Sequence, residues 1–170
     1  MNSSNSLKRV VLAAMLLALC VSGANVKIMG SIAFDSAPAF LGAILLGPIF
    51  GGFLGVFGHL VSAALAGFPL TLPIHLIIAV AMGVCMLVFG WLRQRLGKGT
   101  IKGVIIADIV GYAINVPIEL VFMYPLLKQA VYVYFVPLTI ATVLNLIVCE
   151  IIYAALPKRV KEAPFLRLHS

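Results

Sequence analysis

The sequence predicts an all-α integral membrane protein with six transmembrane helices and both termini in the cytoplasm. Its 170 residues are 63% hydrophobic and only 10% charged, with a mean hydropathy of +1.17. Apolar runs recur along the chain, and a bilayer admits such runs as helices that satisfy their own backbone hydrogen bonds. Basic residues gather between the runs, where they act as orientation signals. We therefore expect one multi-pass domain, residues 1–170, in the cell membrane.

The first predicted helix, 10–26, follows a polar start that ends in Lys8 and Arg9. A basic start, an apolar core and the small residues at 22–24 also resemble a cleaved signal peptide. We favour a retained helix, because the count of membrane crossings given below requires it.

The stretch 34–67 organises the rest of the chain. A single helix of this length would measure about 50 Å, against about 30 Å of bilayer hydrocarbon. Gly47 and Pro48 offer a break, since proline is tolerated at the first position of a helix but not in its interior. We therefore predict a short helix at 38–46 and a second helix at 48–66.

Small residues recur at every fourth position of this stretch, with one histidine in the series. They are Ala43, Gly47, Gly51, Gly55, Ala63 and Gly67, and His59 occupies the remaining position. Such a seam lets helix backbones pack closely in lipid. His59 either forms a hydrogen bond within the bundle or contacts a ligand, and both interpretations stay open.

Three more spans are predicted at 72–92, 104–123 and 136–156. Trp91 at the end of the first of these fits the aromatic belt of a membrane interface. Pro117 is expected to kink the second. An aromatic loop at 124–135 joins the last two, and the basic tail after residue 156 is expected to be mobile.

The positions of the basic residues set the orientation. Ten of the twelve Lys and Arg residues lie at the N-terminus, at 93–102 or in the C-terminal tail. The positive-inside rule places all three segments in the cytoplasm, so an even number of spans must separate each from the next. Four spans before Arg93 and two after Lys102 satisfy this condition.

Polar residues on three predicted helices reach a similar depth in the outer leaflet. They are His75, Asn115, Glu119, Thr142 and Asn145. Asn115 and Glu119 are four positions apart and share a helix face. Such a group indicates a pocket open to the outside, although contacts between helices or with lipid headgroups would also explain some members.

Three other acidic residues are less informative. Asp35 is a candidate for the same pocket or for a lid, and otherwise a helix cap. Asp108 and Glu150 are interpreted as structural or partner-facing, and they could pair with neighbouring side chains.

The sequence contains no P-loop, HExxH or GxSxG motif, so we expect neither ATP hydrolysis nor another enzymatic activity from this chain alone. Cys20, Cys85 and Cys149 lie in apolar runs without a CxxC pair, and we expect buried free thiols. No cofactor or metal site is predicted. The basic segments lack interleaved aromatic residues, so nucleic acid is not an expected partner.

Ala14 and Ala18 form an AxxxA face on the first helix, in VVLAAMLLAL. Together with the size, the predicted topology and the stretch FDSAPAFLGAILLGPIFGGFLGVFGHL, this face resembles the substrate-binding S components of energy-coupling factor (ECF) vitamin transporters. The resemblance covers nearly the whole chain and looks most like the alpha-ribazole branch, alpha-ribazole being a cobalamin precursor.

The resemblance implies a protein that captures a vitamin or precursor from outside, under a lid at about 26–35. It further implies that Ala14 and Ala18 dock onto a transmembrane T component, and that two ATPase subunits power import. Phe34, Phe40 or Phe122 would stack on an aromatic ligand. We assign His75, Asn115 and Glu119 to the ligand from depth and helix face, not from a family motif. Asn145, Asp35 and His59 are further candidates for the same site.

Two alternatives remain at this stage. A membrane-embedded enzyme could use Asp108, Glu119 and the histidines on a lipid-like substrate. A structural subunit could use the glycine seams only to pack helices.

Overall fold

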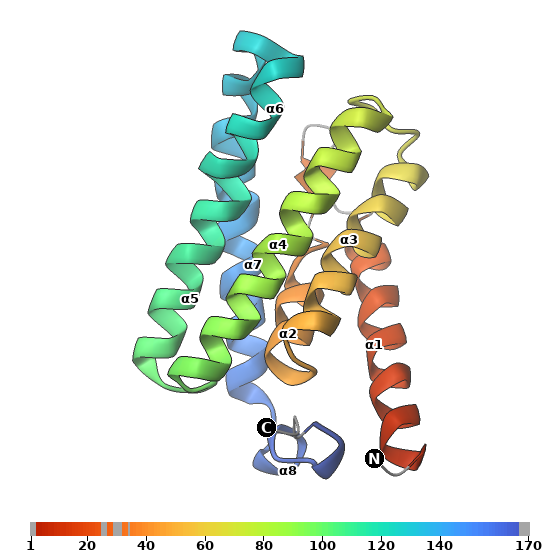
Figure 1. The fold of residues 1–170 in the computed structure, drawn as a ribbon, viewed down its shortest axis with the longest axis vertical. Helices are drawn as coiled ribbons and strands as arrows, with labels where there is room; N and C mark the ends of the chain where they lie inside the picture. Colours follow the sequence, from red (N-terminus) through yellow and green to blue (C-terminus); the bar gives the residue numbers. More distant parts are fainter. Residues whose placement is uncertain (1–2, 25–26, 29–31, 34, 167–170) are drawn as a thin grey trace.

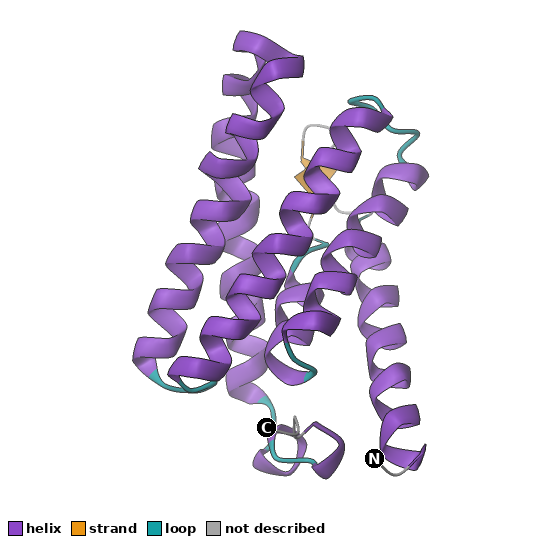
Figure 2. Cartoon of the chain, in the orientation of Figure 1, coloured by secondary structure: helices purple, strands orange, loops and turns teal. Residues whose placement is uncertain are grey.

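The computed structural model describes residues 3–24, 27–28, 32–33 and 35–166. Almost all of these residues are helical (Figure 2). The elements in chain order are α1 (Ser3–Gly23), β1 (Lys27–Ile28), β2 (Ile32–Ala33), α2 (Ala37–Leu45), α3 (Pro48–Leu65), α4 (Leu72–Leu96), α5 (Ile101–Ala113), the π-helix η1 (Ile114–Ile118), α6 (Glu119–Leu127), the 3₁₀ helix η2 (Lys128–Tyr134), α7 (Phe135–Ala155), α8 (Lys158–Lys161) and the 3₁₀ helix η3 (Pro164–Leu166).

The helices form one bundle in which successive segments run in opposite directions (Figure 1). The start of α1, the turn between α4 and α5, and α8 lie together at the lower end in Figure 1, which we call the basic end. The antiparallel pair β1–β2, the loop between α3 and α4, and α6 lie toward the opposite end, which we call the far end.

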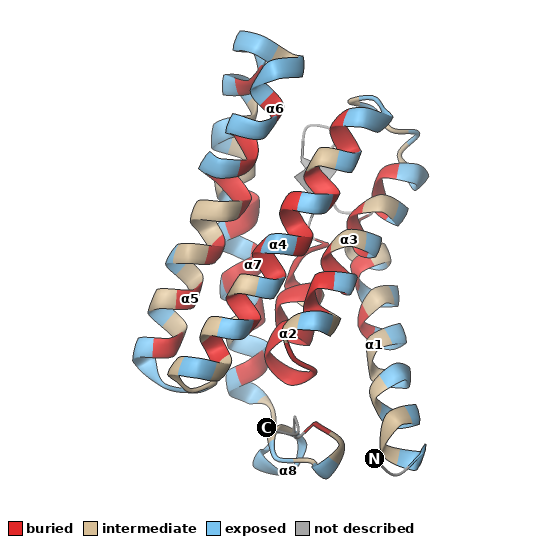
Figure 3. Ribbon diagram, in the orientation of Figure 1, coloured by how far each residue is buried: buried red, intermediate tan, exposed pale blue. Residues whose placement is uncertain are grey.

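The short helix α2 lies at the centre of the bundle, where Figure 3 shows it almost entirely buried. It packs against α1, α3, α4 and α7. Its nine residues give a length of about 14 Å, which is half the thickness of bilayer hydrocarbon. The chain can bury this segment because all of its residues are small or apolar, and all of them except Pro38 are buried against other helices.

Four helical stretches of the described residues are long and apolar enough to cross a membrane: Ser3–Gly23, Pro48–Leu65, Leu72–Leu96 and Ile101–Ala155. The last is 55 residues long and reverses direction near η2, so it contains an outward and a return segment (Figure 1). The prediction of an all-helical membrane protein is confirmed. The prediction of six full spans is not confirmed, because α2 is too short to cross.

Two segments differ from the sequence-based expectation. The expected aromatic loop at 124–135 is helical: α6 continues through Pro125 to Leu127 and η2 follows directly. The expected mobile tail folds back at the basic end, where Leu166 is buried in the core and η3 contacts α1. Apolar residues at 163, 165 and 166 explain why this basic tail packs.

The small residues of α3 allow close packing on both sides. A Cβ added at Gly51 would lie 2.4 Å from the Cβ of Ala43, and one at Gly55 would lie 2.9 Å from the carbonyl oxygen of Met82. Gly47 has a φ of 103° and ends the seam, because it supplies the turn between α2 and α3. This packing brings α2, α3 and α4 together and holds His59 inside the bundle.

Candidate functional site

A cavity of about 50 Å³ lies between α3, α4, η1, α6 and α7, with the start of α2 at one side. Its polar wall consists of Asp35, Ser36, His59, Asn115, Glu119, Thr142 and Asn145. Its apolar wall consists of Leu70, Ile78, Met82, Leu120, Met123, Leu138 and Ala141, and Tyr134 also contacts it. A volume of this size holds a few water molecules.

The π-helix η1 positions two buried polar residues, Asn115 within it and Glu119 directly after it. Asn115 is 4% exposed and Glu119 is 2% exposed. The Nδ2 atom of Asn115 donates to Thr142 Oγ1 at 2.9 Å. Asn115 Oδ1 and Glu119 Oε2 are buried without a hydrogen-bond partner among the described residues. Pro117 lies inside η1 and cannot donate a backbone hydrogen bond, which accounts for the local widening of the helix.

The two histidines of α3 and α4 form a pair. His59 Nε2 lies 3.1 Å from His75 Nδ1, and the backbone N–H of Leu70 donates to His75 Nε2 at 3.4 Å. A neutral imidazole has one donor and one acceptor nitrogen, so His75 donates from Nδ1 to His59 in this arrangement. His59 lines the cavity, and His75 supports it from behind with the ring of Phe68 at 5.7 Å.

Asn145 joins α7 to the start of α2. Its Oδ1 accepts from the backbone N–H of Ala37 at 2.8 Å, and its Nδ2 donates to Ala141 O at 2.9 Å. This contact fixes the segment that carries Asp35, whose Oδ1 accepts a 3.1 Å hydrogen bond from Ser36 Oγ. The N-cap position of α2 belongs to Ser36, so Asp35 is not the cap of this helix.

The structure therefore brings together most of the residues that the sequence suggested. Asp35, His59, Asn115, Glu119 and Asn145 line the same cavity, and His75 lies one layer behind. Phe34 and half of the expected lid at 26–35 lie outside the described residues, and the described half consists of β1, β2 and Asp35.

Neither Phe40 nor Phe122, the two proposed stacking residues that the structure describes, lines the cavity. Phe40 is buried in the core against Phe89, with ring centroids 4.8 Å apart, and Phe122 is exposed on the outside of α6. The phenol ring at the cavity belongs to Tyr134, which lies in the segment 124–135 that was expected to be an aromatic loop. Met82 was also missed, although its spacing of seven from His75 on one helix could have revealed it.

Ala14 and Ala18 are remote from the cavity. Both are exposed on α1, on a face that no described element covers. Among the described residues, no group of three His, Cys, Asp or Glu side chains could hold a metal ion.

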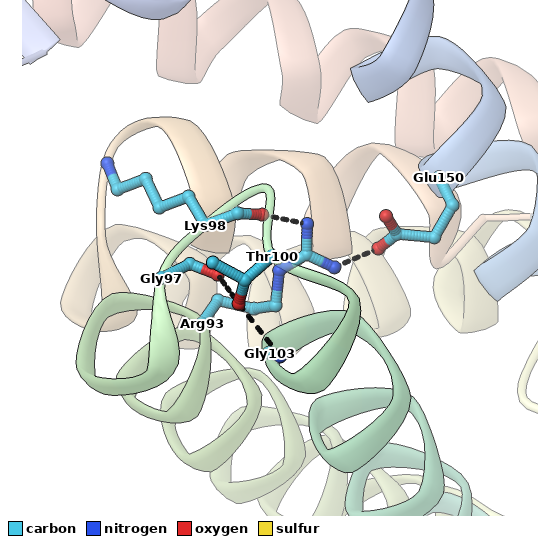
Figure 4. A network of polar contacts seen from close by, with 6 residues as sticks. All are labelled: Arg93, Gly97, Lys98, Thr100, Gly103 and Glu150. Atoms are coloured by element: carbon cyan, nitrogen blue, oxygen red, sulfur yellow. Dashed lines mark hydrogen bonds and ion pairs between the residues drawn. The ribbon is translucent and has the colours of Figure 1, made fainter.

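A second polar cluster lies at the basic end (Figure 4). Glu150 pairs with a neighbouring side chain there, as the sequence suggested it could, but Arg93 was not foreseen as its partner. Arg93 is fully buried and pairs with Glu150 of α7, and its other terminal nitrogen donates to the carbonyl oxygen of Lys98. The ring of Phe89 lies 5.7 Å from its guanidinium carbon and that of Tyr153 lies 5.4 Å away. Arg93 thus ties α4, the α4–α5 turn and α7 together.

The α4–α5 turn has its own cap, also visible in Figure 4. Thr100 Oγ1 accepts from the backbone N–H of Gly103 at 3.0 Å and lies 3.0 Å from the carbonyl oxygen of Gly97, to which it can donate. Gly97 takes a φ of 96°, which glycine adopts without steric cost. The cluster closes the turn, and the side chain of Arg93 within it is completely buried.

One comparison with known proteins gives a match. The model of the family described as "ECF transporter, substrate-specific component" matches residues 8–157. No curated protein and no solved structure matches the chain.

Proposed function

We propose that the cavity bordered by Glu119 and Asn115 binds a vitamin or vitamin precursor, with alpha-ribazole as the first candidate. The proposal follows from the family, because the chain belongs to the ECF transporter substrate-specific components. The family assignment makes the protein an integral membrane, substrate-binding subunit of an ECF importer and not an enzyme. Such a subunit works with a T component and with ATPase subunits that supply the energy.

The observation that carries the site proposal is the pair of buried acceptors without partners. Glu119 Oε2 and Asn115 Oδ1 border a cavity, and unpaired buried polar atoms are costly unless a ligand or water completes them. The other five polar residues of the wall converge on the same space. A bundle that only packed helices would have no reason to keep these groups together.

An aromatic riboside would suit the two walls. Its ring would lie against the apolar side and Tyr134, and its hydroxyl groups would meet Glu119, Asn115 and His59. Ligand pockets usually measure about 300 Å³ or more, whereas this cavity measures about 50 Å³. Binding therefore requires the cavity to widen.

The proposed orientation places the basic end in the cytoplasm and the far end outside. The three basic segments of the sequence lie together at the basic end (Figure 1), as the positive-inside rule requires of short cytoplasmic segments. We propose six passes, of which the short helix α2 forms the second. The cavity would then be reached from outside.

The exposed AxxxA face of α1 is the proposed docking site for the T component. Ala14 and Ala18 leave a shallow surface between larger exposed side chains such as Met15 and Leu19. Small residues at this spacing allow a partner helix to approach closely in lipid.

Thermal unfolding of the detergent-purified protein with alpha-ribazole tests the ligand. A ligand that binds only the folded state stabilises it by about 2.7 kcal/mol at a hundredfold excess over its dissociation constant. We expect a clear rise in melting temperature with alpha-ribazole and ATP-dependent uptake when the T component and ATPases are co-reconstituted. Absence of both responses would exclude alpha-ribazole while leaving the family assignment intact.

A further inference from the structure

The polarity of the cavity restricts the chemistry of its ligand. We propose that the cavity selects an uncharged or cationic compound that donates hydrogen bonds, and that it rejects compounds carrying a carboxylate or phosphate at the polar wall. This inference rests on the proposed function, because it concerns the ligand of the same cavity.

The first argument is the chemistry of Glu119. Its side chain is 98% removed from solvent contact and its Oε2 atom has no partner among the described residues. An ionised carboxylate only accepts hydrogen bonds, and a protonated one still keeps one oxygen as an acceptor. The ionised form of the free oxygen has to be met by a ligand N–H, O–H or cationic group, and a ligand hydroxyl also satisfies the protonated form, because a hydroxyl both donates and accepts.

The second argument is the neighbouring amide of Asn115. Its nitrogen is occupied by Thr142 Oγ1, so the unpartnered atom is the acceptor Oδ1. Asn115 and Glu119 are consecutive members of one helix face. Two acceptors therefore face the same part of the cavity, which suits a ligand with two adjacent donors, such as a diol or an amino group on a ring.

The third argument is the charge around the cavity. The described lining includes the carboxyl groups of Asp35 and Glu119 and contains neither Lys nor Arg. An anionic group placed there would be desolvated beside two carboxyl groups and would meet no Lys or Arg side chain of the described lining, which is strongly unfavourable. A cation would instead form a charge-assisted hydrogen bond with Glu119.

Arg93, the fully buried arginine of α4, cannot supply a cation to the polar wall. Arg93 is fully buried at the basic end and engaged with Glu150 and with Lys98 O (Figure 4). Vitamins recognised through a carboxylate or phosphate would need such a cation at the polar wall.

Three matched pairs of compounds test the proposal: alpha-ribazole and its 5′-phosphate, thiamine and thiamine monophosphate, and riboflavin and FMN. Within each pair the ring system is constant and only a phosphate is added. Affinity is measured by thermal shift and by equilibrium dialysis on the purified full chain. We expect at least one unphosphorylated member to bind, with its phosphate ester bound at least about a hundredfold more weakly.

The Glu119→Gln variant sharpens the test, with Asp108→Asn as its matched control. Glutamine keeps the size of the side chain but replaces one carboxyl oxygen with an NH₂ group that only donates, so affinity for the ligand should fall by about 10- to 100-fold. The ratio between the affinity for the unphosphorylated compound and the affinity for its phosphate ester should become smaller. Asp108 lies on the same continuous helix and lines a separate groove between α5 and α7, so its replacement should change neither quantity. Circular dichroism and the melting temperature without ligand confirm folding.

The outcomes separate this proposal from the assignment of the ligand. Binding of thiamine or riboflavin in place of alpha-ribazole, with the esters rejected, would overturn the alpha-ribazole assignment and support the polarity rule. A phosphate ester, or added biotin or pantothenate, that bound as tightly as the uncharged compounds would overturn the polarity rule and leave substrate binding intact. A panel with no binding compound would overturn both.

Discussion

Asn115 and Asn145 line the same cavity, but their amides have different partners. Both ends of the Asn145 amide bond to backbone groups, at the start of α2 and within α7. Asn115 bonds only through its nitrogen, to a side-chain hydroxyl. The structure thus gives Asn145 a positioning role and leaves an atom of Asn115 for a ligand.

We expect Asn145→Ala to lower the free energy of unfolding by about 1–3 kcal/mol, because the buried N–H of Ala37 loses its partner. Asn115→Ala should change it much less, since the Thr142 hydroxyl can bond to the backbone of its own helix. Thermal unfolding without ligand compares the two variants. Equal melting temperatures would contradict the assigned difference.

The second residue-scale prediction concerns Arg93 and Glu150. Removing one member of a buried ion pair leaves the other charge uncompensated, at a typical cost of about 3–5 kcal/mol. We therefore expect Arg93→Met to be strongly destabilising, and Arg93→Met combined with Glu150→Leu to recover much of the loss. Arg95→Met is the matched control, because Arg95 is exposed on the same helix turn. Additive losses in the double variant would show that the pair is not coupled.

At this scale, sequence reasoning succeeded where helix periodicity was sufficient. The spacing of Asn115 and Glu119 placed them on one face, and both border the cavity. Arg93 was missed because basic residues at a helix end indicate orientation, and nothing local shows that Glu150 folds against this one. Tyr134 was missed for a similar reason, since its contact with the cavity depends on how the α6–α7 reversal packs.

At the scale of elements, α1 differs from the other long helices. In the most apolar 18-residue stretch of α1 only 17% of the residues are buried, whereas the corresponding share in α4 is 56%. α1 packs on α2 and α3 with one face and on η3 near the basic end. A helix with this much uncovered surface can accept a partner helix without disturbing the cavity, which lies on the other side of α2 and α3.

We expect Ala14→Trp combined with Ala18→Trp to bind ligand with unchanged affinity and to lose transport. The indole rings would prevent close approach of a T-component helix but would point away from the described part of the bundle, because both alanines are exposed there. Ligand binding is measured on the purified chain, and co-purification with the T component reports docking. Val80→Trp, at an exposed position of α4, is the control. Unchanged uptake in the double variant would rule out this docking face.

The break at Gly47 and the short helix before it were predicted from length and from one Gly-Pro pair, and the structure has them at 37–45 and 48–65. The helical reversal at 124–135 was not predicted, because Pro125 and the clustered aromatics suggested a loop. Pro125 is accommodated near the end of α6, where its neighbours Tyr124 and Leu126 are exposed.

At the scale of the whole molecule, charge distribution and fold agree. The chain carries a net charge of +7, and the segments that hold most of its basic residues meet at one end of the bundle (Figure 1). The cavity opens among elements nearer the other end. The proposed orientation, with capture of a solute outside and ATP-driven partners inside, needs this polarity, and the positions of the basic residues along the sequence suggested it.

Labelling of introduced cysteines tests the orientation. The native Cys20, Cys85 and Cys149 are fully buried, so a membrane-impermeant maleimide should give little background on intact cells. We expect Lys128→Cys, at the far end, to be labelled from outside, and Arg159→Cys, at the basic end, only after the cells are opened. Both positions are exposed and one helix, α7, separates them. Labelling of Arg159→Cys alone from outside would reverse the orientation, and labelling of both would mean that α7 does not cross the membrane.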